Sequence, residues 1–141
     1  IDQYFALYKK VKVYMEETVA QAKEVGYTLT LMNRKRYLPD LKSQNRQVRE
    51  SAERIAINSP VQGSAADLIK LAMIRLAEEI RKKKLKSRMI LQVHDELVFE
   101  CPEDEEQEMR ALVTKEMEEV MPLKVPLIVD IGWGENWSTA H

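Results

Sequence analysis

The stretch from residue 89 to residue 100, Met-Ile-Leu-Gln-Val-His-Asp-Glu-Leu-Val-Phe-Glu, constrains the fold more than any other part of this sequence. Two apolar runs flank three polar, ionisable residues, His94, Asp95 and Glu96. Strand-forming residues on both sides of a short polar break are typical of a tight β-hairpin. Because carboxylates stay hydrated at a bend, we expect Asp95 and Glu96 to lie at an exposed tip.

Two interpretations of this carboxylate pair are possible. Held on a stiff hairpin, Asp95 and Glu96 are hard oxygen ligands that Mg²⁺ takes together with water and substrate phosphates, which suits phosphoryl transfer. An Asp-Glu pair at a bend is also found as a simple solvated turn, and so short a motif is not specific by itself. The hairpin pattern alone leaves both interpretations open.

Hydrophobic periodicity predicts, in order, a helix, a small hairpin, a long helix, the hairpin of residues 89–100, a helix and a strand. In the first helix, apolar residues recur at three- and four-residue steps from Ile1 onward. We expect Gly26 to end this helix by taking the left-handed conformation. A small hairpin then surrounds a basic loop at residues 33–36. This order indicates the α+β class, with helices packed on one face of an antiparallel sheet.

The long helical pattern covers residues 47–84 and contains Pro60. Proline cannot donate the i→i−4 hydrogen bond, so we expect the helix to break or kink there. Ser59 and Gln62 also fit a capping box at the start of a new helix, which would give Gln62 a purely structural role.

The remaining segments are predicted from end signals and apolar runs. Pro102 begins a helix with an acidic first turn, and residues 127–131 form a strand that completes the sheet. We expect Leu91 to be a core residue of the hairpin. Trp137 is interpreted as an anchor of the C-terminal tail in the core rather than a platform for stacked bases.

Charge is unevenly distributed although the formal net charge is only −1. Residues 31–88 carry 15 basic and 6 acidic side chains, whereas residues 89–141 carry 3 and 13. The basic segment could therefore face nucleic-acid phosphates and the acidic one could house metals. The basic run at residues 81–86 is interpreted as a solvated helix end rather than a DNA contact.

Composition limits the other function classes. A chain of 141 residues that is 45% hydrophobic can build one compact domain with its own core. No apolar run is long enough to span a bilayer and no signal peptide is evident, so we expect a soluble protein with no membrane partner. Cys101 is the only cysteine, so an internal disulfide is excluded. We expect a cytoplasmic location, associated with the nucleoid if the source is bacterial.

Several segments resemble the family A DNA polymerases, the DNA polymerase I family. The similar segments are Val93–Val98 (the family's motif C), Arg36–Asp40 (the base of the fingers), Glu53–Asp67 (the helix that follows the primer-template minor groove), and Gly134–Trp137 with Ala140 and His141 (the C-terminus). The resemblance implies a polymerase palm, an antiparallel sheet that carries a catalytic β-hairpin and is backed by helices. Residues 1–50 or so would form the fingers-base helix and hairpin, and residues 51–141 the palm.

The implied activity is template-directed DNA synthesis, in which a dNTP is added to a primer 3′-hydroxyl with two Mg²⁺ ions. By resemblance, Asp95 would bind both ions, and Glu96 would be a secondary ligand or hold a metal-bound water. His94 would position the primer-terminal phosphate; alternatively it is a satisfied polar residue at the sheet edge.

The resemblance also implies contacts with primer-template DNA. Arg34 and Arg36 would contact template phosphates, although a basic loop is also typical of an ordinary solvated turn. Arg54, Asn58 and Gln62 match the family's minor-groove readers, and their four-residue spacing places them along one face if the helix continues. The minor groove presents acceptors at every base pair, so donors on such a stripe can test pair geometry without reading sequence.

Two parts of the family pattern have no counterpart in this sequence. The motif A Asp that shares the metal ions is missing, and so is the fingers helix with the Arg and Lys that hold the triphosphate. We therefore expect a C-terminal segment of a polymerase domain that is inactive alone and needs the N-terminal remainder. The alternative is a non-catalytic module that binds duplex DNA and docks to a partner chain.

Overall fold

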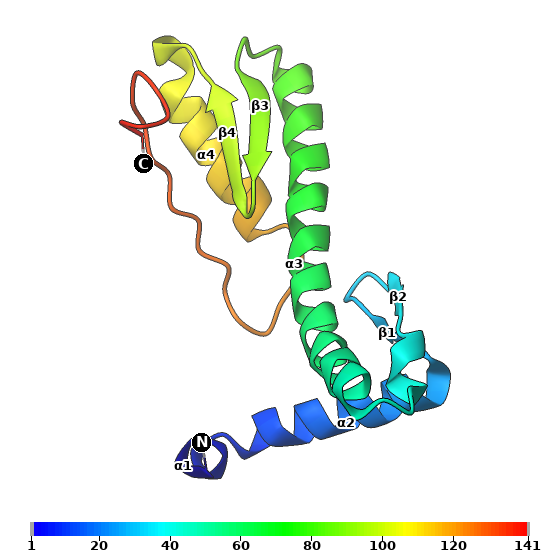
Figure 1. The fold of residues 1–141 in the computed structure, drawn as a ribbon. Helices are drawn as coiled ribbons and strands as arrows, with labels where there is room; N and C mark the ends of the chain where they lie inside the picture. Colours follow the sequence, from blue (N-terminus) through cyan, green and yellow to red (C-terminus); the bar gives the residue numbers. More distant parts are fainter. Residues whose placement is uncertain (1, 141) are drawn as a thin grey trace. The chain divides into compact units, whose positions relative to one another are not determined.

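The computed structural model of this protein describes residues 2–140, so Ile1 and His141 of the sequence predictions lie outside the described residues. The chain forms two compact units, one ending at Asp67 and the other starting at Leu68. Helix α3, Arg46–Lys83, runs through this boundary (Figure 1).

The first unit contains two helices, a small hairpin, a 3₁₀ turn and the first part of α3. Its elements are α1 (Asp2–Leu7), α2 (Lys9–Val25), β1 (Tyr27–Leu29), β2 (Lys35–Tyr37) and η1 (Pro39–Lys42). Gly26 ends α2 as predicted, with φ 83°, and its N–H donates to the Ala22 carbonyl at 2.8 Å. A positive φ costs glycine little because it has no Cβ.

The core of this unit is built from small residues that let the elements approach closely. Ala22 of α2 and Leu41 of η1 are buried against Ala52 and Ala56 of α3, of which Ala56 is completely inaccessible. The β1–β2 hairpin is antiparallel, and Tyr27 pairs with Tyr37 across it.

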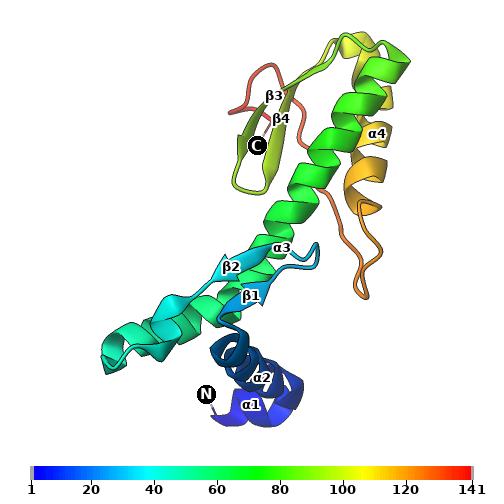
Figure 2. The same cartoon turned by 90° about the vertical axis from the view of Figure 1, so that its right-hand side faces the viewer.

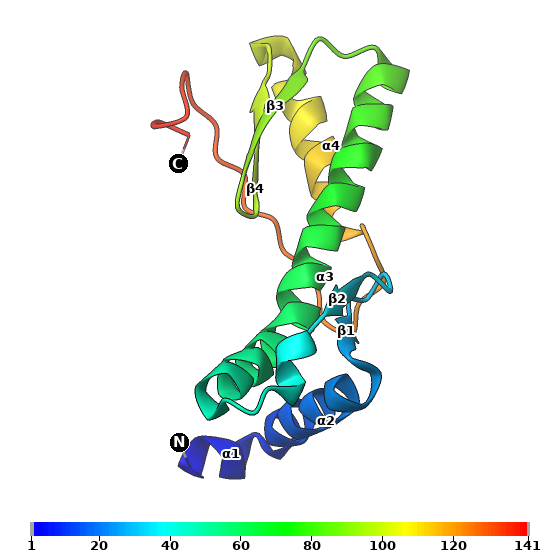
Figure 3. The same ribbon diagram turned by 45° about the vertical axis from the view of Figure 1, so that its right-hand side comes forward.

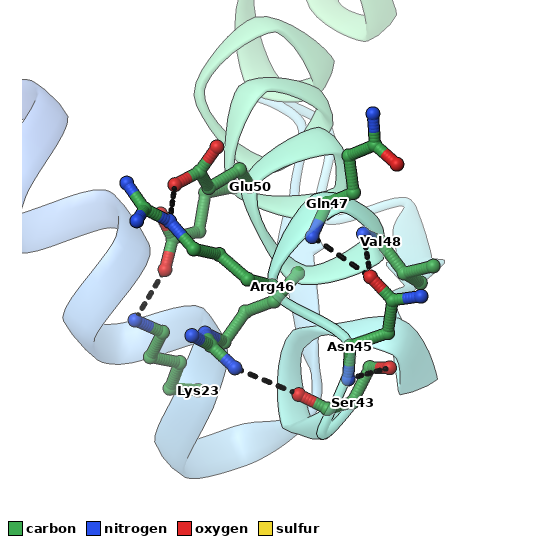
Figure 4. Close-up of polar contacts among 9 residues, drawn as sticks. Lys23, Ser43, Asn45, Arg46, Gln47, Val48 and Glu50 are labelled. Carbon is green, nitrogen blue, oxygen red and sulfur yellow. Dashed lines mark hydrogen bonds and ion pairs between the residues drawn. The ribbon is translucent and has the colours of Figure 1, made fainter.

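Helix α3 begins at a side-chain cap. The Asn45 Oδ1 accepts the N–H groups of Gln47 at 2.9 Å and Val48 at 3.4 Å, which satisfies two of the donors that a helix start leaves unpaired (Figure 4). The Arg49 guanidinium also donates to the Ser43 carbonyl at 2.9 Å.

Helix α3 passes through Pro60 without a break, so the predicted helix start at Ser59 is wrong. The Ser59 hydroxyl donates to the Ile55 carbonyl at 2.6 Å instead of capping a new helix. Gln62 lies in the middle of α3, far from either end of the helix. A proline inside a helix costs about 3 kcal/mol. The helix is buried on both sides of the proline, at Ala56 and Ser64, and the Ser64 hydroxyl donates to the Pro60 carbonyl at 2.5 Å.

The second unit contains the remainder of α3, a hairpin and one further helix, seen from a second side in Figure 2. Its elements are β3 (Arg88–Val93), β4 (Glu96–Glu100), η2 (Glu103–Glu105) and α4 (Glu106–Glu118). Leu76 and Ile80 of α3 form its core with three residues of α4, Met109, Leu112 and Val113. Met89, Leu97 and Phe99 of the hairpin pack against this core.

A β-bulge in β3 reverses the side-chain alternation of the hairpin. Met89 pairs with Phe99 and Leu91 with Val98, so Ile90 is an extra residue on one strand. Leu91 therefore faces away from the core side of Met89, and it is 45% exposed. The prediction that Leu91 is buried is wrong because the sequence does not reveal the bulge.

The predicted strand at residues 127–131 is also wrong. This segment has no regular secondary structure, and the two sheets of the described residues each contain only two strands. Val129 and Ile131 pack against the core, but the Val129 N–H donates to the Glu118 carboxylate at 3.0 Å. A strand requires a ladder partner, and this segment has none within residues 2–140.

The C-terminal tail is held by Trp133 rather than by Trp137. Trp137 is 48% exposed, so its predicted anchoring role is wrong. The Arg110 guanidinium lies 5.8 Å from the centre of the Trp133 ring and also donates to the Ile131 carbonyl at 3.2 Å. This places one cation over the more buried of the two indoles.

The described residues thus form a mixed α+β fold with small antiparallel sheets. None of the helices within residues 2–140 combines the length and the apolar character that crossing a bilayer requires.

Candidate functional site

The β3–β4 hairpin closes with a two-residue turn at His94 and Asp95, because Val93 pairs directly with Glu96 (Figure 3). His94 adopts a positive φ of 53°, which is uncommon for a residue with a Cβ. The Gln92 side-chain amide donates to the His94 carbonyl at 3.0 Å and supports this turn. His94, Asp95 and Glu96 are all exposed, as the sequence predicts for a hairpin tip.

Two adjacent exposed carboxylates can supply part of a Mg²⁺ shell but not all of it. Within residues 2–140, no group of three or more His, Cys, Asp or Glu side chains is arranged to hold a metal ion. Mg²⁺ takes six oxygen ligands and usually retains several waters, so one or two protein carboxylates are enough when a substrate phosphate adds the rest. Asp95 and Glu96 fit that limited role.

The base of the hairpin is fixed by polar contacts that the sequence did not suggest. The Glu105 carboxylate accepts the Lys86 N–H at 2.8 Å, the Ser87 N–H at 2.9 Å and the Ser87 hydroxyl at 2.6 Å. These bonds, that from Lys86 foremost, lower the pKa of the Glu105 carboxyl. Burial raises the pKa of the neighbouring Cys101 thiol, whose sulfur lies 3.1 Å from the Ser87 Oγ.

In the first unit, the predicted DNA-reading stripe lies on the exposed side of α3. Arg54, Asn58 and Gln62 are all exposed, whereas Ala52 and Ala56 face the core. Because α3 is continuous, side chains four residues apart share one face. The geometry that the minor-groove prediction requires is therefore present on this helix.

Arg34 forms an ion pair and a hydrogen bond within the first unit. Its guanidinium lies 2.6 Å from the Asp67 carboxylate and also donates to the Gly63 carbonyl at 3.1 Å. Asp67 is 7% exposed, so its charge needs a nearby cation. The contact of Arg34 with a template phosphate stays a prediction, but this arginine already neutralises a buried carboxylate.

The loop between β1 and β2 is attached to α3 by contacts with small residues. The Leu31 N–H donates to the Ser64 Oγ at 2.9 Å, and a Cβ on Gly63 would lie 2.6 Å from the Thr30 methyl. Glycine at position 63 thus permits this close approach. The run of small residues at 63–66 was the sequence signal for it, whereas nothing in the sequence linked Asp67 to Arg34.

Arg36 and Arg54 line the same open groove of about 600 Å³. The groove lies between β2 with η1 and the first turns of α3, and its lining includes Tyr37, Gln47 and Ser51. Arg36 is exposed, and so are Tyr37 and Gln47. The structure therefore brings two predicted DNA-binding arginines together, in a groove with aromatic and amide side chains.

Three cations of the basic run at residues 81–86, and Arg88 at the start of β3, form ion pairs with acidic residues. The ion pairs join Lys82 to Glu79, Lys83 to Glu108, Lys86 to Asp104 and Arg88 to Glu100. The uneven charge along the sequence is partly balanced in space here, because Lys83, Lys86 and Arg88 pair with acidic residues of the segment after residue 89. This pairing agrees with the interpretation of a solvated helix end.

Comparisons with known proteins cover almost the whole chain. The family described as "DNA polymerase family A" matches residues 1–139. The chain is 53% identical over 137 residues to DNA polymerase I of Caldicellulosiruptor bescii and 50% identical over 140 residues to DNA polymerase I of Bacillus subtilis. These alignments cover 97% and 99% of this chain but only 16% of each relative, so the chain spans about one sixth of their length.

A solved structure is similar over the same range. It is described as the "POL domain of Pol1 from M. smegmatis complex with DNA primer-template and dNTP". The two structures superimpose with a TM-score of 0.96 at 51% sequence identity, over 99% of this chain and 24% of that one.

Proposed function

The chain belongs to DNA polymerase family A, and we propose that it is the C-terminal part of a polymerase domain that performs template-directed DNA synthesis. The observation that carries this proposal is the exposed Asp95–Glu96 pair at the tip of the β3–β4 hairpin, one face of which packs on a core. Such a hairpin presents two carboxylates on a rigid element, as a phosphoryl-transfer site needs.

Asp95 and Glu96 would hold Mg²⁺ at the hairpin tip, together with a carboxylate from outside this chain. When bound there, Mg²⁺ supplies Lewis-acid stabilisation of the negative charge that develops on the phosphate oxygens. Asp95 would be the direct ligand, and Glu96 would be a second ligand or would orient a water molecule. His94 would donate a hydrogen bond to the primer-terminal phosphate, which fixes the primer end.

The first unit would contribute the track for the primer-template duplex. Arg54, Asn58 and Gln62 would donate to minor-groove acceptors, which are present at every correctly formed base pair. Arg36 would contact template phosphates from the groove that it shares with Arg54. Residues 1–50 or so would belong to the base of the fingers, and residues 51–141 to the palm.

The dNTP and part of the metal site would depend on the N-terminal remainder of the polymerase. We therefore expect the 141-residue chain alone to show no template-directed primer extension, whereas the complete polymerase that contains it extends the primer. The assay is primer extension with purified protein, Mg²⁺ and all four dNTPs, with circular dichroism to verify that the fragment is folded.

The same assay decides between the two candidate functions. Robust dNTP incorporation by the folded fragment would contradict the proposal that dNTP binding and part of the metal site depend on the N-terminal remainder. A complete protein that binds duplex DNA but never extends a primer would indicate the alternative, a DNA-binding and docking module.

The minor-groove prediction is tested with Gln62→Ala and Arg54→Ala in the complete polymerase. We expect both variants to slow extension from mismatched termini by about tenfold more than from matched ones, because each lost donor faces a base edge. The measurement is single-nucleotide incorporation from matched and mismatched primers. Lys70→Ala, a change to another exposed cation of α3, serves as the control. Equal loss of affinity for every duplex, with a shallower salt dependence, would identify phosphate contacts instead.

A further inference from the structure

The contacts at the base of the β3–β4 hairpin join both of its ends to the start of α4. Ser87 immediately precedes β3 and Cys101 immediately follows β4, and their side chains are 3.1 Å apart. Glu105, the last residue of η2, accepts three hydrogen bonds from Lys86 and Ser87. Ser87 is 2% exposed, and its two bonds to Glu105 are partly buried, whereas the bond from Lys86 is exposed.

Apolar packing and these hydrogen bonds constrain the hairpin in different ways. Met89, Leu97 and Phe99 hold the hairpin against α3 and α4, but apolar contacts have no preferred direction and tolerate small shifts along the strands. Hydrogen bonds to a carboxylate are directional, and those made by ionised groups are about twice as strong as neutral ones. Three of them on two consecutive residues fix the start of β3 in position.

We propose that Glu105 is a positioning residue for polymerisation, which acts through Ser87 to fix the β3–β4 hairpin along its strand direction and so determines where Asp95 lies. This inference rests on the proposed function, because it assigns the metal-binding role to Asp95. Glu105 does not touch substrate or metal in this account. It acts from the opposite end of the hairpin, roughly 25 Å from the tip at the usual rise of a strand.

The ionisation of Glu105 supports this role at neutral pH. The hydrogen bonds from Lys86 and Ser87 lower its pKa, so the carboxylate is ionised at neutral pH and acts as a pure acceptor. The contribution of these bonds to stability is complete above the carboxyl's ordinary pKa and is lost only as the pH falls through the lowered value.

The test uses Glu105→Gln and Ser87→Ala in the complete polymerase. Gln keeps the shape of Glu105 but has only one acceptor oxygen, so its NH₂ faces a donor of either Lys86 or Ser87 and the arrangement of three bonds is broken. Ser87→Ala removes the hydroxyl alone and leaves the two amide donors. Lys83→Gln is the matched control, because the Lys83–Glu108 ion pair at 2.7 Å also joins α3 to α4 but contacts no hairpin residue.

Two measurements are made on each variant. Hydrogen exchange of the peptides covering residues 85–97 reports whether the hairpin base has loosened. Single-turnover incorporation over a range of Mg²⁺ concentrations, with saturating primer-template and dNTP, reports whether the metal requirement has changed. Loss of fold stability alone does not raise the Mg²⁺ concentration that gives half of the maximal rate.

We expect Glu105→Gln to accelerate exchange at Lys86 and Ser87 and to raise the half-saturating Mg²⁺ concentration by about tenfold, as displacement of residues that orient metal ligands does elsewhere. Ser87→Ala should change both quantities in the same direction by a smaller factor, and Lys83→Gln should change neither. This second variant keeps the test decisive if Glu105→Gln does not fold.

The proposal is overturned if exchange accelerates while the Mg²⁺ requirement stays within about twofold of the wild-type value, a change too small to signal displaced ligands. Unchanged exchange would equally overturn it, since the three bonds would then not hold the hairpin. Asp95→Asn in the same assay separates the two hypotheses. If that variant is inactive while Glu105→Gln is normal, only the positioning role fails; if Asp95→Asn is active, the proposed function itself fails.

Discussion

Replacing Asp95 by Asn in a complete polymerase that contains this segment is expected to reduce the rate of nucleotide incorporation by about 10³-fold or more. Asn has nearly the same shape as Asp but carries no charge, so the change removes one ligand charge from the site without altering the turn. Affinity for primer-template DNA should remain within about threefold of the wild-type value, because the proposed phosphate and minor-groove contacts are assigned to residues other than Asp95.

The measurement is single-turnover incorporation of one dNTP, with the dissociation constant of the primer-template measured in parallel. Glu100→Gln is the control, since Glu100 lies on the same hairpin and pairs with Arg88 at 2.6 Å, away from the tip. A rate for Asp95→Asn within about tenfold of wild type would contradict the assignment of Asp95 as a metal ligand. An equal loss of incorporation rate for Glu100→Gln would show that any charge change on this hairpin disturbs activity.

Truncation of Leu76 to Ala is expected to cost roughly 2–5 kcal/mol of stability, the usual cost of a buried Leu→Ala change. Leu76 is completely inaccessible and lies in the core between α3 and α4. Leu91→Ala is the matched control on the hairpin. It should cost far less, because the bulge at Ile90 turns Leu91 away from the core and leaves it 45% exposed.

Thermal unfolding of each variant in EDTA, in the complete polymerase, measures these effects. Asp95→Asn belongs in the same series and should leave the melting temperature unchanged or slightly higher, since it removes one of two adjacent like charges. A clear destabilisation by Asp95→Asn would identify its carboxylate as a structural hydrogen-bond acceptor. Equal losses of stability for Leu91→Ala and Leu76→Ala would contradict the bulged register of β3.

The features that the sequence predicted correctly depend on local chemistry. Glycine at position 26 favours a left-handed helix end, and polar residues between two apolar runs favour a turn at residues 94 and 95. Arg54, Asn58 and Gln62 share one face of the continuous helix, as their four-residue spacing predicts. In each case a few neighbouring residues determine the outcome.

The predictions that failed depend on partners distant in the sequence. An apolar run such as residues 127–131 has strand character, but it becomes a strand only beside another strand with free hydrogen-bonding groups. A new helix start at Ser59 fits the local capping pattern, but α3 continues through Pro60 with buried residues on both sides of it. The period of a strand does not reveal a bulge, so the burial of Leu91 could not be predicted.

The polar residues that hold the candidate site were missed for the same reason. Arg34 and Asp67 are 33 positions apart, and Ser87 and Glu105 are 18 apart. Glu105 appeared to be one of several acidic residues at a helix start, where a carboxylate is favourable in any case. Its specific role becomes visible only when the fold brings the start of β3 to η2.

The central claim, that the His94–Asp95 turn forms part of a metal site, is tested most directly by iron-mediated cleavage. Fe²⁺ replaces Mg²⁺ in the complete polymerase with primer-template and dNTP bound, and ascorbate then generates hydroxyl radicals that cut the backbone close to the bound ion. We expect cleavage at residues 93–97 that excess Mg²⁺ suppresses and that Asp95→Asn abolishes. Cleavage that leaves this turn intact, or that persists unchanged in Asp95→Asn, would contradict the claim.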